Sequence, residues 1–288
     1  MDVHLRRLAA GQADVVAIWQ LFQAGWTRHR VNHHAHTRGW RRVHPGVYVL
    51  TSSPLTRRQL WFAAVLTAPG TVLSHGSAGA CYGFYRFDKR FEVVTRPGNG
   101  GRKRQGRLLV LRSTTLEGNI ARRDGIPITT AARTLIDLAP GLKRKQIGRA
   151  FREAIRLKCT TAARVREALD RHPGRPGTPV LRDLATRYSR IPYHRTRSDA
   201  EARALELLHD AGFPPPRVNV LVAGEEADLV WPGVIVEIDG PQYHQFPEED
   251  ARKQALWEGA GYVVRRAPSD VVYDAPDRFV AAYRQPPG

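Results

Sequence analysis

Cysteine is scarce in this sequence, and long apolar runs do not occur. The 288 residues include two cysteines, Cys81 and Cys159, which are far apart and form no metal-ligand pair. This excludes a disulfide framework and favours a reducing compartment. No stretch is long and apolar enough to cross a membrane, and no signal peptide is evident. We therefore expect a cytoplasmic protein without a membrane partner.

Acidic residues are also scarce, but only in the first two thirds of the chain. The net charge is +18; residues 1–197 contain 37 basic and 11 acidic residues, whereas residues 198–288 contain 8 and 16. A basic body attracts phosphate and gives sequence-independent affinity for nucleic acid, so we expect double-stranded DNA as the partner. Binding to a membrane surface is the alternative, but no basic amphipathic helix with an aromatic-rich apolar face is present.

Lysine is rare among the cations, with 6 lysines among 45 lysine and arginine residues. Arginine is the better fork for phosphate and for guanine edges. A GC-rich genome also encodes arginine readily, so this bias alone does not decide between the two explanations.

The sequence ADLVWPGVIVEID, residues 227–239, predicts a β-hairpin with a tight turn at its central Pro-Gly. Trp231 then pairs with Val234, and three residues further back along each strand Asp228 pairs with Glu237. Directly opposed residues on one sheet face lie about 5 Å apart, a spacing at which like charges repel. A divalent cation removes this penalty, because Mg²⁺ is commonly held by one or two carboxylates with waters and phosphate oxygens.

The first fifty residues predict a winged helix-turn-helix. Apolar residues at helical spacing predict the first helix: Val15, Val16, Ile18, Trp19 and Phe22. Gly25 breaks this helix, and Thr27 caps a second helix over residues 27–38 that is cationic outside a thin apolar stripe, as in recognition helices of the major groove. Residues 41–50 predict a wing strand. The expected DNA contacts are Arg28, Arg30, His33, Arg38, Arg41 and Arg42. A small solvated helical domain is the alternative.

Residues 53–190 predict a basic mixed α/β region that becomes helical. We expect helices near 56–67 and 74–82, strands near 91–95 and 108–111, and helices throughout 129–188. The loop 96–107 combines glycines with cations, and a mobile hairpin loop and a phosphate-binding loop are equally good explanations for it. Its predicted DNA contacts are Arg102, Lys103 and Arg104. The segment 172–177 interrupts the helices near a domain boundary.

Three stretches of the basic region, GWRRVHPGVYVL, LSHGSAGACYGF and GIPITTAARTLIDLA, resemble antitoxins of the type IV toxin–antitoxin (abortive infection) systems. Those proteins pair an N-terminal winged helix with a further domain and repress their own promoter. The resemblance therefore implies promoter binding and allows a cognate toxin as a second partner.

The stretches SDAEARALELLHDAGF, ADLVWPGVIVEIDGPQYH and EEDARKQALWEGAGYVVRRAPSDVV resemble the very-short-patch-repair-like branch of the PD-(D/E)xK nucleases, in the order helix, hairpin, helix and strand. In such nucleases the hairpin Asp and Glu hold the metal. The resemblance therefore implies that Asp228 and Glu237, with the carbonyl of Ile238, bind Mg²⁺ or Mn²⁺, and it implies no organic cofactor. Glu201 would support the metal or its water.

This sequence departs from that family at Asp239, where a lysine usually orients the attacking water and stabilises the phosphate. His244 is the best replacement, because histidine can act as a general base near neutral pH. Gln242, Arg252 and Lys253 are further candidates for contact with water or phosphate.

Several of these residues also have purely structural explanations. Glu201 completes a capping box with Ser198, in which the Glu carboxylate returns to the backbone N–H of the cap. His244 could hydrogen-bond Asp239, and the two hairpin carboxylates could lie exposed without a metal.

We therefore expect a multidomain protein of α+β and α/β type. The predicted domains are a winged helix-turn-helix in 1–52, a basic mixed α/β to helical antitoxin-like domain in 53–190, and a restriction-endonuclease-like domain in 191–288. The expected function is DNA binding with metal-dependent endonuclease or nickase activity, in toxin–antitoxin, phage-defence or DNA-repair systems. The alternative is a non-catalytic antitoxin-like repressor with a degenerate nuclease fold. The intact carboxylate pair favours the nuclease, and the absent lysine favours the repressor.

Overall fold

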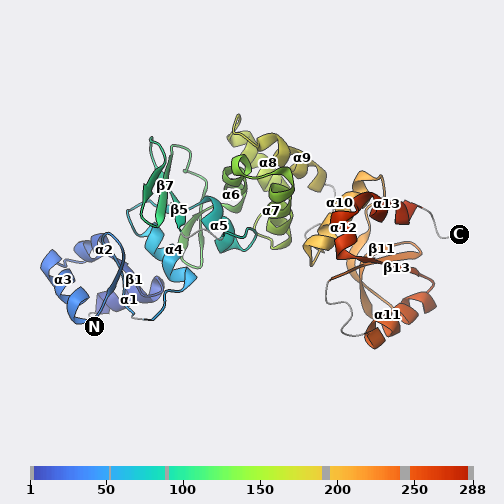
Figure 1. Ribbon diagram of the computed structural model, residues 1–288, viewed down its shortest axis with the longest axis horizontal. Coiled ribbons are helices and arrows are strands. Elements are labelled where there is room, and N and C mark those ends of the chain that lie inside the picture. The colour runs from blue at the N-terminus through green and yellow to red at the C-terminus, as the bar shows by residue number, and fades with distance from the viewer. Residues whose placement is uncertain (1–2, 52, 88–90, 190–194, 241–246, 285–288) are drawn as a thin grey trace. The chain divides into compact units, whose positions relative to one another are not determined.

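The protein is a mixed α+β structure that divides into two compact units (Figure 1). The computed structural model describes residues 3–51, 53–87, 91–189, 195–240 and 247–284. Over these residues the chain forms 13 α-helices and three separate sheets, which confirms the predicted α+β class. The first unit comprises residues 1–143 and 172–178, and the second comprises 144–171 and 179–288. None of the described helices combines the length and the hydropathy that a membrane span requires.

The first fifty residues fold as a helix, a strand, two helices and a hairpin. Their elements are α1 (Val3–Gly11), β1 (Val15–Ala17), α2 (Ile18–Gln23), α3 (Arg28–Thr37), β2 (Arg41–His44) and β3 (Val47–Val49). Strand β3 lies between β1 and β2 and is antiparallel to both. The turn before β3 requires Gly46, because its φ is +73° and a Cβ atom there would lie 2.8 Å from Ile18 Cγ2.

Two predictions for this region are wrong and one is confirmed. Val15 and Val16, expected on a helix, lie in β1 and are fully buried. A short apolar run fits both periodicities, so its spacing could not separate strand from helix. Residues 41–50 form two strands joined by a turn rather than one wing strand. The second predicted helix is confirmed as α3, and the Thr27 hydroxyl caps it by accepting a hydrogen bond from the N–H of Arg30 at 3.2 Å.

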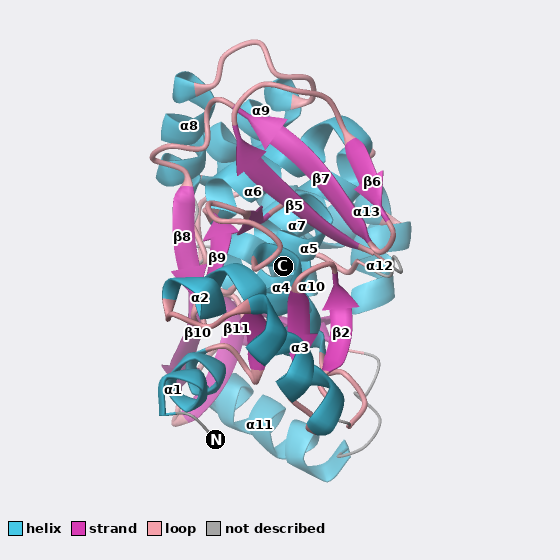
Figure 2. Ribbon diagram, turned by 90° about the vertical axis from the view of Figure 1, so that its left-hand side faces the viewer, coloured by secondary structure: helices cyan, strands magenta, loops and turns pink. Residues whose placement is uncertain are grey.

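The rest of the first unit is a six-stranded sheet with helices. Its elements are α4 (Arg57–Val65), β4 (Val72–Leu73), α5 (His75–Tyr82), β5 (Glu92–Pro97), β6 (Lys103–Gln105), β7 (Leu108–Ser113), β8 (Ile120–Arg123), β9 (Ile126–Thr129), α6 (Ala131–Leu138) and the 3-10 helix Ala139–Gly141. The strand order is β6-β7-β5-β4-β9-β8. Figure 2 shows β5, β7 and the edge strand β6 side by side. The predicted loop 96–107 is therefore wrong in part, because β6 pairs with β7 as an exposed edge strand.

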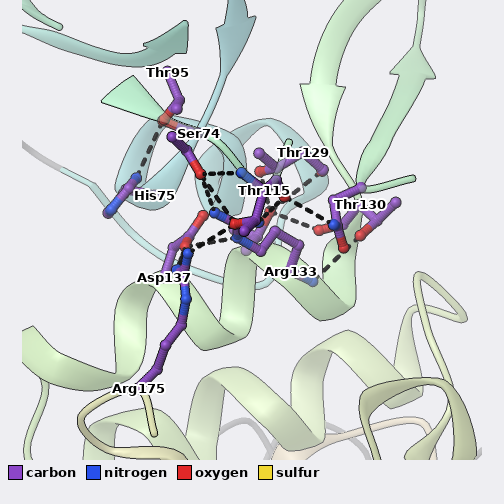
Figure 3. A network of polar contacts seen from close by, with 12 residues as sticks. Ser74, His75, Thr95, Thr115, Thr129, Thr130, Arg133, Asp137 and Arg175 are labelled. Carbon is purple, nitrogen blue, oxygen red and sulfur yellow. Dashed lines mark hydrogen bonds and ion pairs between the residues drawn. The ribbon is translucent and has the colours of Figure 1, made fainter. Parts of the chain in front are cut away.

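A buried ion pair in α6 ties a distant segment to the first unit (Figure 3). The side chains of Arg133 and Asp137 are 2% and 4% exposed, and Arg133 Nε lies 2.8 Å from Asp137 Oδ1. Arg133 also donates to the carbonyl of Thr115 at 2.6 Å. Arg175 donates to the same Asp137 oxygen at 2.8 Å. This last contact holds Arg175, in the segment 172–178, against the first unit, although the segment follows two helices of the second.

The second unit combines a four-stranded sheet with helices on both sides (Figure 1). Its elements are α7 (Arg144–Arg156), α8 (Ala162–Arg171), α9 (Thr178–Tyr188), α10 (Asp199–Asp210), β10 (Arg217–Val222), β11 (Glu225–Trp231), β12 (Val234–Asp239), α11 (Pro247–Gly259), β13 (Val263–Pro268), α12 (Ser269–Asp274) and α13 (Pro276–Arg284). The sheet order is β10-β11-β12-β13, antiparallel except for the parallel pair β12–β13. Helices α10, α12 and α13 lie on one side, and α11 packs Trp257 into the core on the other.

Helix α7 belongs with the C-terminal elements because its cations pair with α10. Arg152 is buried, and its guanidinium lies 3.1 Å from both Asp199 Oδ1 and Glu206 Oε2. The apolar face of α7 is buried throughout: Ile147, Ala150, Phe151, Ala154 and Ile155. The compact units therefore group α7 with residues that we assigned to another domain, and the ranges 1–52, 53–190 and 191–288 stay a prediction.

Replacing Arg133 by methionine should destabilise the first unit strongly. Methionine keeps much of the volume but leaves the Thr115 carbonyl and part of the Asp137 charge without a partner in the interior, a change that costs about 3 to 5 kcal/mol in buried ion pairs. We expect a loss of this size in the free energy of unfolding, measured by urea denaturation. The control is Arg122→Met on the exposed surface of β8, which should change stability by less than about 0.5 kcal/mol. Equal losses in the two variants would contradict the buried role of Arg133.

Candidate functional site

The hairpin of β11 and β12 brings Asp228 and Glu237 together as predicted. Trp231 pairs with Val234, and regular pairing continues to Leu229 and Val236. Beyond Leu229 and Val236, the two strands are joined by hydrogen bonds between side-chain carboxylates and backbone N–H groups. The N–H of Asp228 donates to Glu237 Oε1 at 2.8 Å, and the N–H of Ile238 donates to Asp228 Oδ2 at 2.8 Å. Each carboxylate is thus held by the backbone of the opposite strand.

The two hairpin carboxylates carry an electrostatic penalty. Burial, together with the charges of Glu237, Glu201 and Asp239, raises the pKa of Asp228 to about 8, against the hydrogen bond from the Ile238 N–H. Burial also raises the pKa of Glu237. Among the described residues, no cation lies within ion-pair distance of either hairpin carboxylate. The pair therefore has no direct ion-pair partner, although the more distant charges of Arg266 and Lys253 lower the pKa of Glu237.

Glu201 of α10 adds negative potential at the hairpin but does not form the capping box that we predicted. The hydroxyl of Ser198 does accept the N–H of Glu201, at 3.0 Å. The carboxylate of Glu201, however, returns to the N–H of Arg197 at 2.8 Å, one residue before the cap. The same Glu201 oxygen accepts a hydrogen bond from Asn219 Nδ2 at 3.0 Å. Glu201 is thus buried and held at two points, close enough to raise the pKa of Asp228.

Arg266 is a site residue that the sequence did not indicate. Strand β13 runs parallel to β12 with Arg266 in register with Glu237. Arg266 Nη1 lies 3.3 Å from Asp239 Oδ1 and 3.7 Å from Asp250 Oδ1, and its charge lowers the pKa of Glu237. Parallel neighbours are distant in sequence, so the one local signal was a pair of consecutive arginines within the otherwise apolar strand β13. Asp239, predicted as a catalytic residue, is therefore ion-paired.

The remaining predicted residues divide into three groups. Arg252 forms an ion pair with Glu225 at 2.6 Å, so it contacts the start of β11, at the end of the hairpin opposite the turn. Lys253 lies 3.5 Å from Glu249, and its charge lowers the pKa of Glu237, which places it near the site. His244 and Gln242 lie outside the described residues, and their roles stay predictions.

The donor set fits a divalent cation held with waters and substrate oxygens, not a closed protein site. No group of three or more His, Cys, Asp or Glu side chains capable of holding a metal is found in the described part of the chain. Two carboxylates are nevertheless enough for Mg²⁺, which keeps several waters and takes phosphate oxygens from the substrate. Asp228 and Glu237 are the residues that would hold it, and the carbonyl of Ile238 stays a predicted ligand.

In the first unit, the residues predicted to contact DNA lie on the surface. In α3 the stripe residue Val31 is fully buried in a cluster with Trp26 and Trp40. The cationic and polar side chains predicted as contacts are all exposed: Arg28, Arg30, His33, Arg38, Arg41, Arg42, Arg102, Lys103 and Arg104. One histidine of α3 differs, since His34 lies half-buried 5.0 Å from the ring of Trp26 and 5.9 Å from that of Trp40.

No protein-family model matches this sequence. A comparison with curated proteins likewise gives no significant match. Interpretation of the site therefore rests on the geometry and electrostatics of its own residues.

The raised pKa of Asp228 predicts that the metal-free protein loses stability as the pH rises. The folded protein binds the Asp228 proton more tightly than the unfolded chain does. This contribution is therefore full near the ordinary pKa of 3.8 and is lost as the pH rises through about 8. Asp228→Asn still accepts the Ile238 N–H bond but does not ionise, so it should raise the melting temperature at pH values of about 8 in EDTA. Asp277→Asn, at an exposed position in α13, is the control. A lowered melting temperature for Asp228→Asn would contradict the assignment.

Proposed function

We propose that this protein binds duplex DNA and cleaves its phosphodiester backbone with the help of Mg²⁺ or Mn²⁺. The observation that carries the proposal is the half-buried pair Asp228 and Glu237, held by crossed hydrogen bonds and without a direct ion pair to any described cation. Burial of two like charges opposes folding, and a bound cation offsets that cost. The order helix, hairpin, helix and strand around the pair supports the nuclease fold.

Each described residue near the pair has a role in this proposal. When bound, the metal would supply a water of lowered pKa and neutralise charge on the scissile phosphate. Asp228 and Glu237 would hold it, and Glu201 would add to the negative potential that favours cation binding. Arg266, with its side chain 16% exposed beside Asp239, would provide the positive charge that the family's lysine supplies. The general base would be His244, as the sequence predicts.

DNA binding is proposed for the first unit. The order helix, strand, helix, helix and hairpin, with a three-stranded sheet, is the order expected of a winged helix-turn-helix. The exposed face of α3 carries Arg28, Arg30 and Arg38. Phosphate contacts from such cations supply affinity independent of sequence, and side chains on the recognition helix read base edges. The excess of basic residues in 1–197 has the sign that this role requires.

A second function, a non-catalytic DNA-binding repressor, is favoured by one specific observation. Asp239 stands where the related nucleases carry lysine, and it is ion-paired with Arg266. If the ion pair with Asp239 prevents Arg266 from binding a phosphate, the domain keeps the nuclease fold but does not cleave DNA. The two functions differ in cleavage and agree in DNA binding.

Supercoiled plasmid separates the two functions. We expect wild-type protein to nick or cut it with Mg²⁺ or Mn²⁺, and Asp228→Asn and Glu237→Gln to lose on the order of 100-fold in rate, because ligand loss removes the metal. Asp277→Asn should cut at the wild-type rate. Gel shifts on the same DNA should give equal binding for all four proteins, with or without EDTA.

The contrary results are equally clear. Binding without cleavage under either metal would assign the protein to the repressor class. Cleavage that persists in both carboxylate variants would place the active site elsewhere. Absence of DNA binding would remove both proposals.

A further inference from the structure

A cavity of about 140 Å³ lies in the first unit, apart from the carboxylate site. Its walls come from β2, α4, β5 and the residue preceding β7, and they include four arginines, Arg41, Arg42, Arg57 and Arg107. The buried side chains of His44 and Glu92 also line it. A water molecule occupies about 30 Å³ in the liquid, so the cavity has room for an oxyanion and its waters.

An irregularity in β2 places consecutive residues on this cavity. Arg42 pairs with Tyr48 and His44 pairs with Val47, so Val43 is an extra residue on the β2 side. In a regular strand, neighbouring side chains point to opposite faces. The bulge breaks that alternation, and the four residues 41–44 all line the cavity. Bulges of this kind re-aim side chains, here toward α4 and β5.

The charges around the cavity do not balance. Glu92 is neutralised, because Arg57 Nη1 lies 3.3 Å from its Oε1 and the hydroxyl of Ser77 donates to its Oε2 at 2.7 Å. The side chains of Arg41, Arg42 and Arg107 are exposed, and the structure gives them no ion pair or hydrogen bond with any described residue. Within the described part of the chain, three positive charges therefore line the cavity without an ion-pair partner.

Two neighbouring groups are consistent with this excess of positive charge. His44 is buried, and both burial and the charge of Arg107 lower its pKa, so its imidazole is neutral at pH 7 and can donate to an anion without adding to the repulsion. The cavity residue Phe91 carries the guanidinium of Arg104 over its ring at 5.0 Å. The cationic surface of edge strand β6 is thus continuous with the cavity.

We propose that this cavity is a phosphate-binding site, with Arg41, Arg42 and Arg107 as the anion ligands. Guanidinium groups bind phosphate oxygens with paired, charge-assisted hydrogen bonds, and three unpaired groups around one hollow favour a single oxyanion. The chemistry accepts either a backbone phosphate of DNA or a free phosphate. Binding of a DNA phosphate rests on the proposed DNA binding, because the cavity includes Arg41 and Arg42 of β2, which we expect to contact the duplex.

The phosphate chemistry is tested first, on the full-length protein and without DNA. Inorganic phosphate, compared with chloride at equal ionic strength, should raise the melting temperature of the wild type by binding the folded state. The double variant Arg42→Gln/Arg107→Gln should lose this increase. Arg122→Gln on β8, at the opposite edge of the same sheet from β6, is the matched control and should keep it. Equal increases in the double variant and the control would overturn the proposal.

The source of the phosphate is tested by the salt dependence of duplex binding, measured by fluorescence anisotropy. If one DNA phosphate occupies the cavity, the double variant should lose about 0.9 in the slope of log affinity against log salt, the value for a single phosphate, although two arginines are removed. An unchanged slope, with the phosphate effect on melting lost, would assign the site to free phosphate. If the wild type binds no DNA, the proposed function fails, and the melting experiment still decides the cavity.

Discussion

The candidate site depends on two carboxylates that face each other across one hairpin. The hydrogen bonds from the N–H groups of Asp228 and Ile238 fix their positions. Amide groups carry only partial charges, so they position the carboxylates without neutralising them, and the pKa of each stays raised. The site thus combines defined geometry with a persistent electrostatic cost. Fold stability alone does not account for such a pair, because partly burying like charges without a direct ion-pair partner opposes folding.

The contrast with other acidic residues of the second unit strengthens this argument. Asp199 and Glu206 share the buried Arg152, and Asp239 has Arg266. Each of these three carboxylates therefore has an arginine as its ion-pair partner. At the hairpin the chain supplies backbone N–H groups, and it adds the negative potential of Glu201. This arrangement suits a site at which a bound metal ion supplies the positive charge.

Local features of the sequence could be predicted, whereas long-range ones could not. The Pro-Gly turn and strand lengths fix the register from Trp231 to Val236, so the carboxylate pair followed from counting residues. Arg266 could not be found in this way, because β13 meets β12 in parallel only after the intervening α11. The short strand β1 was mistaken for a helix, since three consecutive buried residues carry no periodicity of their own. Glu201 shows that the exact partner of a capping side chain was not predictable: its carboxylate accepts the N–H of Arg197, one residue before the expected Ser198.

The two proposed sites need opposite electrostatics, and the distribution of charge along the chain meets both needs. A phosphate approaching Asp228 and Glu237 is repelled until a cation is bound, so the carboxylate site cannot be the source of affinity for DNA. The cavity at Arg41, Arg42 and Arg107 attracts phosphate without any metal. If each unit keeps its role, affinity is set by salt and cleavage by the divalent ion. DNA binding and cleavage would then be controlled separately. A repressor that kept the nuclease fold but did not cleave DNA would still bind DNA through the first unit.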